Sequence, residues 1–98
     1  MSSNIKRKVA AIMFTDIAGY TEQMSKDENK AFALIQKKRE LLLPIIKKHK
    51  GKLIKEIGDG TLTRYFKADN AINCASTFQS KTDIDLNVRA GIHTCSHV

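Results

Sequence analysis

The sequence predicts an α+β domain in which two helices cover one face of an antiparallel sheet. Short β-prone runs and longer runs with helical spacing follow one another in the order strand, helix, strand, strand, helix, strand. That is the element order of the split β-α-β unit. The chain has 98 residues, 42% of them hydrophobic and 28% charged, which is ordinary composition for one compact domain and leaves no room for two.

The first strand is predicted over residues 8 to 14, which are continuously apolar after Lys8. A run of this kind is too short for a stable helix and is typical of a strand buried on both faces. Asp16 follows at its carboxyl end, ahead of a turn that contains Gly19.

A long helix is predicted to begin at Ser25, because the sequence SKDE of residues 25 to 28 has the capping-box pattern. Apolar residues then recur at helical spacing, with an interruption at Lys38, and Gly51 is a natural stop after a cationic last turn. Pro44 is expected to kink or split the helix, since proline lacks a backbone donor and its ring crowds the preceding turn.

Two β-prone runs, residues 52 to 57 and 61 to 66, are separated only by Gly58-Asp59-Gly60, which predicts a hairpin with a carboxylate in its turn. A second helix is expected to follow, with Asp69 or Asn70 as its cap. Its apolar stripe has the spacing i, i+3, i+4, i+7 and consists of Ala71, Cys74, Ala75 and Phe78.

The last strand has the clearest pattern in the chain. Apolar and polar residues alternate from Ile84 to Ile92, as in a strand with one buried face. This completes the six predicted elements.

Asp16 and Asp59 are candidates for one site. If the first strand and the hairpin are neighbours in the sheet, the two carboxylates converge. Carboxylates held close together repel, so such a pair either binds a cation or retains a proton. Oxygen ligands favour Mg²⁺ or Mn²⁺ over zinc. Taken singly, each aspartate is more often explained by turn chemistry or capping.

The residues around the two aspartates resemble a known family. Residues 14 to 21 (FTDIAGYT) and residues 55 to 60 (KEIGDG) are similar to the two metal-binding segments of class III nucleotidyl cyclase catalytic domains. The intervening RELLLP of residues 39 to 44 and the later GIH of residues 91 to 93 also match. The resemblance implies the ferredoxin-like β-α-β-β-α-β core of a cyclase domain, with an antiparallel sheet and helices on one face.

The resemblance divides the chain into a short tail, residues 1 to 5, and the N-terminal part of a cyclase catalytic domain, residues 6 to 98. Family members continue for many residues beyond this point. The continuation holds a second purine-selecting residue and the Asn and Arg that stabilise the transition state. Cys95 stands where the family has glycine, and His97 at an apolar position. We therefore expect a C-terminally truncated, incomplete domain.

The resemblance also implies roles for individual residues. Asp16 and Asp59, with the carbonyl of Ile17, would hold two Mg²⁺ or Mn²⁺ ions. The following segment would supply backbone amides and a hydroxyl to the nucleotide phosphates: Ala18, Gly19, Tyr20 and Thr21. Lys55 matches the lysine that contacts adenine in adenylate-type members, where guanylate-type members have glutamate.

The implied activity is that of an adenylate cyclase, which converts ATP to 3′,5′-cyclic AMP and pyrophosphate by two-metal catalysis for intracellular signalling. In these dimers the lysine serves the site whose metals the partner chain holds, so a homodimer with shared sites is expected. One alternative is a non-catalytic remnant that binds metal-nucleotide or a partner cyclase chain. A remote alternative is an RNA-binding module, although residues 61 to 66 do not reproduce its aromatic, glycine-rich motif.

The formal charge of +7 is interpreted as a mostly solvated lysine-rich surface, without a nucleic-acid partner. No apolar stretch approaches the roughly 20 residues needed to cross a bilayer, and no targeting signal is convincing. Cys74 and Cys95 have neither disulfide nor zinc-ligand spacing and suit a reducing compartment. The expected location is cytoplasmic.

Overall fold

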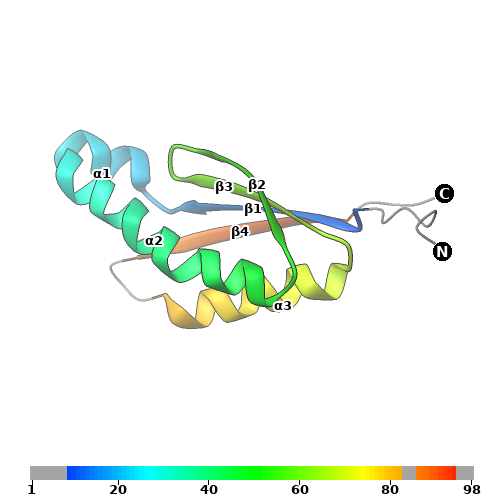
Figure 1. The fold of residues 1–98 in the computed structure, drawn as a ribbon. Helices are drawn as coiled ribbons and strands as arrows, with labels where there is room; N and C mark the ends of the chain where they lie inside the picture. The colour runs from blue at the N-terminus through cyan, green and yellow to red at the C-terminus, as the bar shows by residue number, and fades with distance from the viewer. Residues whose placement is uncertain (1–8, 83–85, 95–98) are drawn as a thin grey trace, which may run out of the picture.

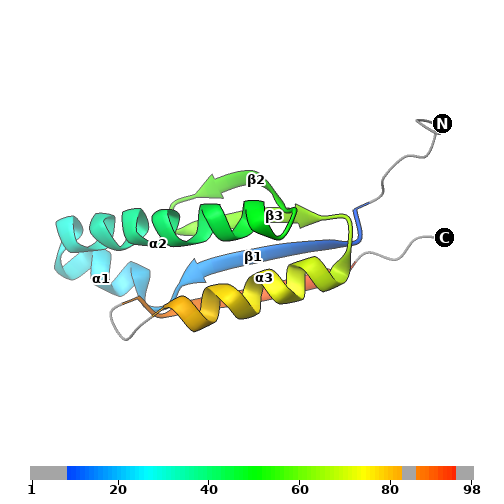
Figure 2. The ribbon, with the colours of Figure 1, turned by 60° about the horizontal axis from the view of Figure 1, so that its bottom comes forward.

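The computed structural model describes residues 9–82 and 86–94. Within these ranges the chain forms a four-stranded antiparallel sheet and three helices, which confirms the predicted α+β class. Two of the helices lie side by side across one face of the sheet (Figure 1, Figure 2). The elements are β1 (Ala11–Ile17), α1 (Tyr20–Lys26), α2 (Glu28–Lys48), β2 (Lys52–Ile57), β3 (Gly60–Tyr65), α3 (Ala68–Lys81) and β4 (Val88–Thr94).

The strands are arranged in the order β2-β3-β1-β4, so β1 is central and is paired with the hairpin strand β3 on one side and with β4 on the other. The expected adjacency of the first strand and the hairpin is therefore confirmed. Alternate residues of β1 are buried against the helices, whereas Phe14 points to the opposite face and is 42% exposed, so the prediction of burial on both faces is wrong. The strand continues to Ile17 and includes Asp16, because its pairing with β4 extends to Ile17 opposite Val88.

The buried core lies between this sheet and the helices α2 and α3. The predicted stripe of the second helix is largely confirmed, since Ala71, Cys74 and Phe78 of α3 are fully buried. The strand predicted from Ile84 is seen from Val88, and residues 83–85 lie outside the described part. The predicted buried face of this strand is wrong beyond Val88, since Ala90 and Ile92 are exposed. The predicted tail of residues 1 to 5 and the departures at Cys95 and His97 also lie outside it.

The beginnings of the helices differ from the prediction. An additional helix, α1, precedes α2 and contains Ser25, whose hydroxyl donates to the Glu22 carbonyl at 2.8 Å. Asp27 is the N-cap of α2 instead, because its carboxylate accepts from the Lys30 amide at 3.1 Å. The predicted cap of α3 is also wrong, since that helix begins at Ala68 and Asp69 lies in its first turn.

Pro44 does not split α2, which runs unbroken from Glu28 to Lys48. The carbonyl that loses its partner to proline is that of Glu40, one turn earlier. Both residues are exposed, so water can take the place of the missing amide.

The end of α2 is a Schellman motif. Lys50 adopts the left-handed conformation with φ 60°, and the Gly51 amide donates to the Ile46 carbonyl at 2.9 Å. The position of Gly51 after the helix had indicated that it would be the left-handed residue, but Lys50 has that role. A β-carbon on Gly51 would instead overlap the ring of Tyr65, whose Cζ would lie 2.9 Å away.

Within the described residues, no helix is both long enough and apolar enough to span a bilayer.

Candidate functional site

Asp16 and Asp59 lie at the same edge of the sheet and line a pocket of about 380 Å³. Asp16 comes from β1, and Asp59 from the turn between β2 and β3. The structure thus brings together the two carboxylates that the sequence singled out. The pocket is lined by Asp16, Ile17, Gly19, Tyr20, Thr21, Glu22, Asp59 and Arg89.

The turn that carries Asp59 is tied to the end of β1. The Ile17 amide donates to Oδ2 of Asp59 at 2.9 Å, which fixes the carboxylate beside the strand that carries Asp16. The turn itself depends on Gly58, whose φ of 57° is a conformation that favours glycine. The second glycine, Gly60, leaves room for the ring of Phe14, which an added β-carbon would meet at 2.7 Å.

Asp16 is paired with Arg89, a residue that the sequence analysis did not single out. Arg89 is directly opposite Asp16 in the β1–β4 pair, and its Nε and Nη2 donate to the two carboxylate oxygens, each at 2.8 Å. The hydrogen bonds to Asp16 raise the pKa of Arg89, so the guanidinium stays charged. In sequence, Arg89 is only one of several polar residues in an alternating strand, and the strand register is what gives it a place in the site.

Lys38 lies beneath both aspartates and is the second residue that the sequence analysis missed. Its side chain comes from α2 and is 2% exposed. Its ammonium donates to the carbonyl of Thr15 at 3.0 Å, to the carbonyl of Asp59 at 2.6 Å and to Oγ1 of Thr61 at 3.0 Å. Burial lowers the pKa of Lys38 to about 8, against the attraction of nearby carboxylates, foremost that of Asp59.

The segment after Asp16 lies partly in the pocket. Gly19, Tyr20 and Thr21 line it, and Gly19 turns the chain into α1 with φ 75°. Ala18 is not among the lining residues, and its amide donates to the carbonyl of Asn87 at 2.8 Å. Of the four residues expected to face phosphates, three therefore face the pocket.

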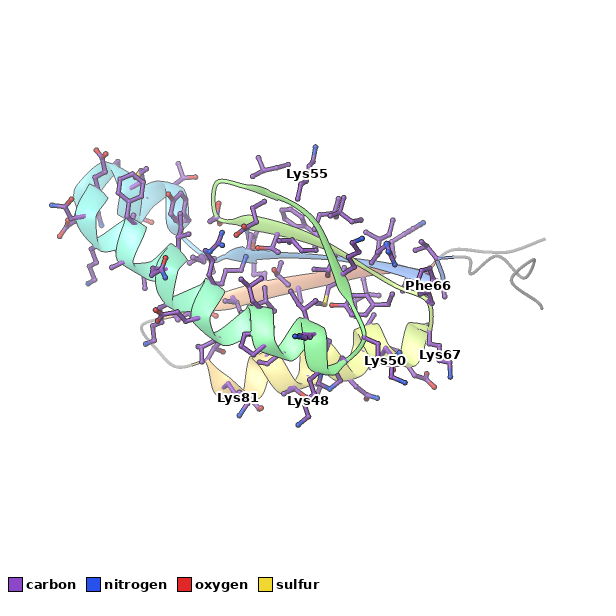
Figure 3. All side chains as sticks on the ribbon, in the orientation of Figure 1. Lys48, Lys50, Lys55, Phe66, Lys67 and Lys81 are labelled. Carbon is purple, nitrogen blue, oxygen red and sulfur yellow. The ribbon has the colours of Figure 1, made fainter. Side chains whose placement is uncertain are left out.

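Lys55 does not belong to this pocket. It is exposed on β2 and points away from the sheet near the hairpin (Figure 3). Its neighbour Glu56 forms an ion pair with Arg39 of α2, which holds β2 against the helix layer. Within one chain, Lys55 and the aspartate pair are therefore separate features.

The donor set of the pocket suits a hard cation that completes its coordination with other oxygens. Within the described residues, no group of three or more His, Cys, Asp or Glu side chains is placed to hold a metal ion alone. Mg²⁺, however, is usually bound by one or two carboxylates together with water and substrate phosphates. Asp16 already holds a cationic group, the Arg89 guanidinium, in this geometry. The two aspartates therefore fit a metal that arrives with a phosphate ligand.

Comparison with known proteins finds cyclases and a protein kinase, although no family model matches the chain. The kinase is "Serine/threonine-protein kinase pkn2" of Myxococcus xanthus, 28% identical over 94% of this chain and 12% of that protein. The chain is 36% identical over 77 residues to "Putative adenylate cyclase 3" of Rhizobium meliloti (strain 1021), an alignment that covers 78% of this chain and 13% of that protein. The adenylate/guanylate cyclase/hydrolase structure from Silicibacter pomeroyi is 29% identical, with a TM-score of 0.68, and 89% of this chain matches 55% of that one.

A bacterial light-regulated adenylyl cyclase has the same fold, with a TM-score of 0.75 and 20% identity over 87% of this chain and 53% of the other. The chain therefore spans about half the length of these solved structures and a small part of the curated relative. From the fold, the converging aspartates and these similarities, we conclude that the chain belongs to the class III nucleotidyl cyclase family and corresponds to part of its catalytic domain.

Proposed function

We propose that the chain is part of an adenylate cyclase catalytic domain, which forms 3′,5′-cyclic AMP and pyrophosphate from ATP. The observation that carries this proposal is the convergence of Asp16 and Asp59 on one pocket. The name of the relative from Rhizobium meliloti, a putative adenylate cyclase, supports the adenylate class.

In this proposal Asp16, Asp59 and the Ile17 carbonyl hold two Mg²⁺ or Mn²⁺ ions. When bound, such a pair activates an attacking hydroxyl and stabilises a leaving phosphate, the general logic of two-metal displacement. The protein contributes the placement of the carboxylates. The Ile17 amide orients Asp59, and the β1–β4 register sets Asp16 opposite Arg89.

Arg89 is proposed to exchange partners when metal and nucleotide bind. A guanidinium is suited to two-point contact with phosphate as well as with carboxylate. The Arg89 side chain is 70% exposed and lines the pocket, so it can turn from Asp16 to a phosphate without leaving the site. Gly19, Tyr20 and Thr21 are proposed to contact the remaining phosphate oxygens.

Arg89→Ala tests this exchange. Without the competing guanidinium, Asp16 is free, so Mn²⁺ alone is expected to bind about 3- to 10-fold more tightly, whereas Mn²⁺–ATP binds more weakly. Electron paramagnetic resonance measures free Mn²⁺, and calorimetry measures ATP binding. Lys48→Ala, which removes an exposed cation at the end of α2, is the control. Weaker binding of Mn²⁺ alone to Arg89→Ala would contradict the exchange.

Lys55 is proposed to contact adenine in the site of a second copy, within a homodimer that shares its sites. Its position outside the aspartate pocket of its own chain supports this arrangement. Large apolar side chains on the strands are also exposed, among them Phe14 at 42% and Ile57 at 60%. In the proposed dimer the second copy would cover these side chains.

Lys55→Glu is expected to weaken ATP binding about 10-fold in the presence of Mn²⁺ and to reduce the preference for ATP over GTP, because it replaces a donor by an acceptor. Calorimetric titration with each nucleotide measures this, at protein concentrations where light scattering shows a dimer. Lys52→Glu makes the same charge change on an exposed residue of the same strand. Equal losses in the two variants would assign the effect to net charge alone.

Catalysis is tested in a hybrid in which residues 9–94 replace the matched segment of the Silicibacter pomeroyi cyclase. The hybrid is expected to form cyclic AMP from ATP and Mn²⁺, and its Asp16→Asn form is not. A hybrid that binds Mn²⁺–ATP without forming any cyclic nucleotide would contradict catalysis and favour a nucleotide-binding cyclase homologue.

A further inference from the structure

A lysine lies where the long helix faces the candidate site. Lys38 interrupts the apolar face of α2, and at 2% exposure it is as buried as the hydrophobic residues around it. Lysine is almost never fully buried without compensating partners, because its charge loses hydration. The position therefore requires an explanation beyond packing.

The three contacts of Lys38 join three separate segments. The Thr15 carbonyl immediately precedes Asp16 on β1, the Asp59 carbonyl belongs to the hairpin turn, and the Thr61 hydroxyl lies on β3. An ammonium has three donors, and all three are used here. Thr15 and Thr61 are direct partners in the β1–β3 pair, so the ammonium lies below the point where strand and turn meet.

The Lys38 contacts act together with the hydrogen bond from the Ile17 amide to the Asp59 carboxylate. Lys38 holds the backbone of Asp59 to the backbone beside Asp16, and the Ile17 amide holds the Asp59 carboxylate. None of the three acceptors of Lys38 is a carboxylate oxygen, so Lys38 itself occupies neither carboxylate. A direct ion pair with Asp59 would have occupied one of its oxygens.

We propose that Lys38 is a positioning residue, which sets the separation of Asp16 and Asp59 by binding the backbone that carries each of them. This inference rests on the proposed function only in assigning metal ions to the two carboxylates. In metal sites, groups that orient the ligands typically change metal affinity by about 10- to 100-fold when they are removed.

The charge and the geometry of Lys38 have opposite effects on metal binding, and this difference makes the proposal testable. A positive charge beneath two carboxylates repels a metal ion. If charge alone mattered, Lys38→Met would bind Mn²⁺ more tightly. If positioning dominates, Lys38→Met binds Mn²⁺ at least 10-fold more weakly. Lys48→Met, which changes an exposed lysine of the same helix (Figure 3), controls for net charge.

A second pair of variants keeps the lysine and does not depend on the tolerance of Lys38→Met. Thr61→Val removes one acceptor and is expected to weaken Mn²⁺ binding about 3-fold. Thr15→Val is the matched control, because Thr15 is buried opposite Thr61 but its hydroxyl has no partner among the described residues, and its carbonyl remains. The pair separates loss of the contact from loss of a buried hydroxyl.

The experiment measures Mn²⁺ affinity by electron paramagnetic resonance, with circular dichroism to show that each variant is folded. The amide resonance of Ile17, recorded without metal, is the second readout, because it reports the bond to the Asp59 carboxylate. We expect it to shift in Lys38→Met and Thr61→Val but not in Lys48→Met or Thr15→Val.

Unchanged or tighter Mn²⁺ binding by folded Lys38→Met and Thr61→Val would overturn the positioning role. If the wild-type chain binds no Mn²⁺, the proposed function fails, and the Ile17 resonance still decides whether Lys38 positions the turn. In that case, an Ile17 amide resonance that is unshifted in both Lys38→Met and Thr61→Val would by itself refute the positioning role of Lys38.

Discussion

Asp59→Asn is expected to weaken Mn²⁺ binding by at least about 100-fold while leaving the fold intact. Asparagine keeps an oxygen that can accept from the Ile17 amide, so the turn retains its tie to β1. What it loses is the negative charge, one of only two in the carboxylate pair. In the hybrid cyclase the same change is expected to abolish formation of cyclic AMP.

Asp69→Asn is the matched control for this substitution. Asp69 is exposed in the first turn of α3 and is not among the residues that line the pocket. The Asp69→Asn substitution makes the same change of side chain and of net charge as Asp59→Asn. If Asp59→Asn, like its control Asp69→Asn, binds Mn²⁺ with the affinity of the wild type, the metal assignment of Asp59 is wrong.

Gly51→Ala is expected to lower the free energy of unfolding by about 2 to 3 kcal/mol, the largest effect on stability that we predict. The new methyl group would overlap the ring of Tyr65, which is fully buried, and would also approach Ile46. Neither neighbour can move into solvent, so the end of α2 must shift away from β3. Urea unfolding followed by circular dichroism measures the change.

Lys50→Gly is the informative comparison at the adjacent residue. Lys50 has the left-handed conformation at φ 60°, which glycine adopts without the cost of a β-carbon. The variant is expected to be more stable by about 0.5 to 1 kcal/mol. If Gly51→Ala were as stable as the wild type, the close contact between the helix end and Tyr65 would not hold.

Much of the fold was predicted from local patterns in the sequence, although the alternation in the last strand did not predict its burial, since only Val88 of β4 is buried. The apolar face of α3, the β2–β3 hairpin and the adjacency of the first strand and the hairpin all agree with the structure. Asp59 was found because it lies between two glycines, and Asp16 because it lies in a short segment that ends a predicted strand ahead of Gly19. Patterns of this kind are visible in a single segment.

The features that the sequence did not reveal depend on pairing between distant segments. Arg89 belongs to the site only through its register with Asp16 across 73 residues of sequence. In the sequence, Lys38 only interrupts an apolar stripe, and this interruption was the one signal that a buried lysine lies on this helix. The cap of α2 was missed because Ser25 and Asp27 both fit a capping pattern, and the structure uses Asp27, at the break between α1 and α2.

The two basic residues give the site its electrostatic character. Arg89 neutralises Asp16 from the pocket side, and Lys38 offsets the charge of both carboxylates from the core side. The protein can therefore hold two carboxylates close together before any metal arrives. Arg89 is exposed and can be displaced, whereas Lys38 is buried and is expected to stay.

The central claim is that Asp16 and Asp59 bind metal-nucleotide, and calorimetric titration of ATP into the chain with saturating Mn²⁺ tests it most directly. We expect saturable binding by the wild-type chain and none by the double variant Asp16→Asn, Asp59→Asn. Equal affinity of the two proteins, or no binding by a folded wild-type chain, would contradict the claim.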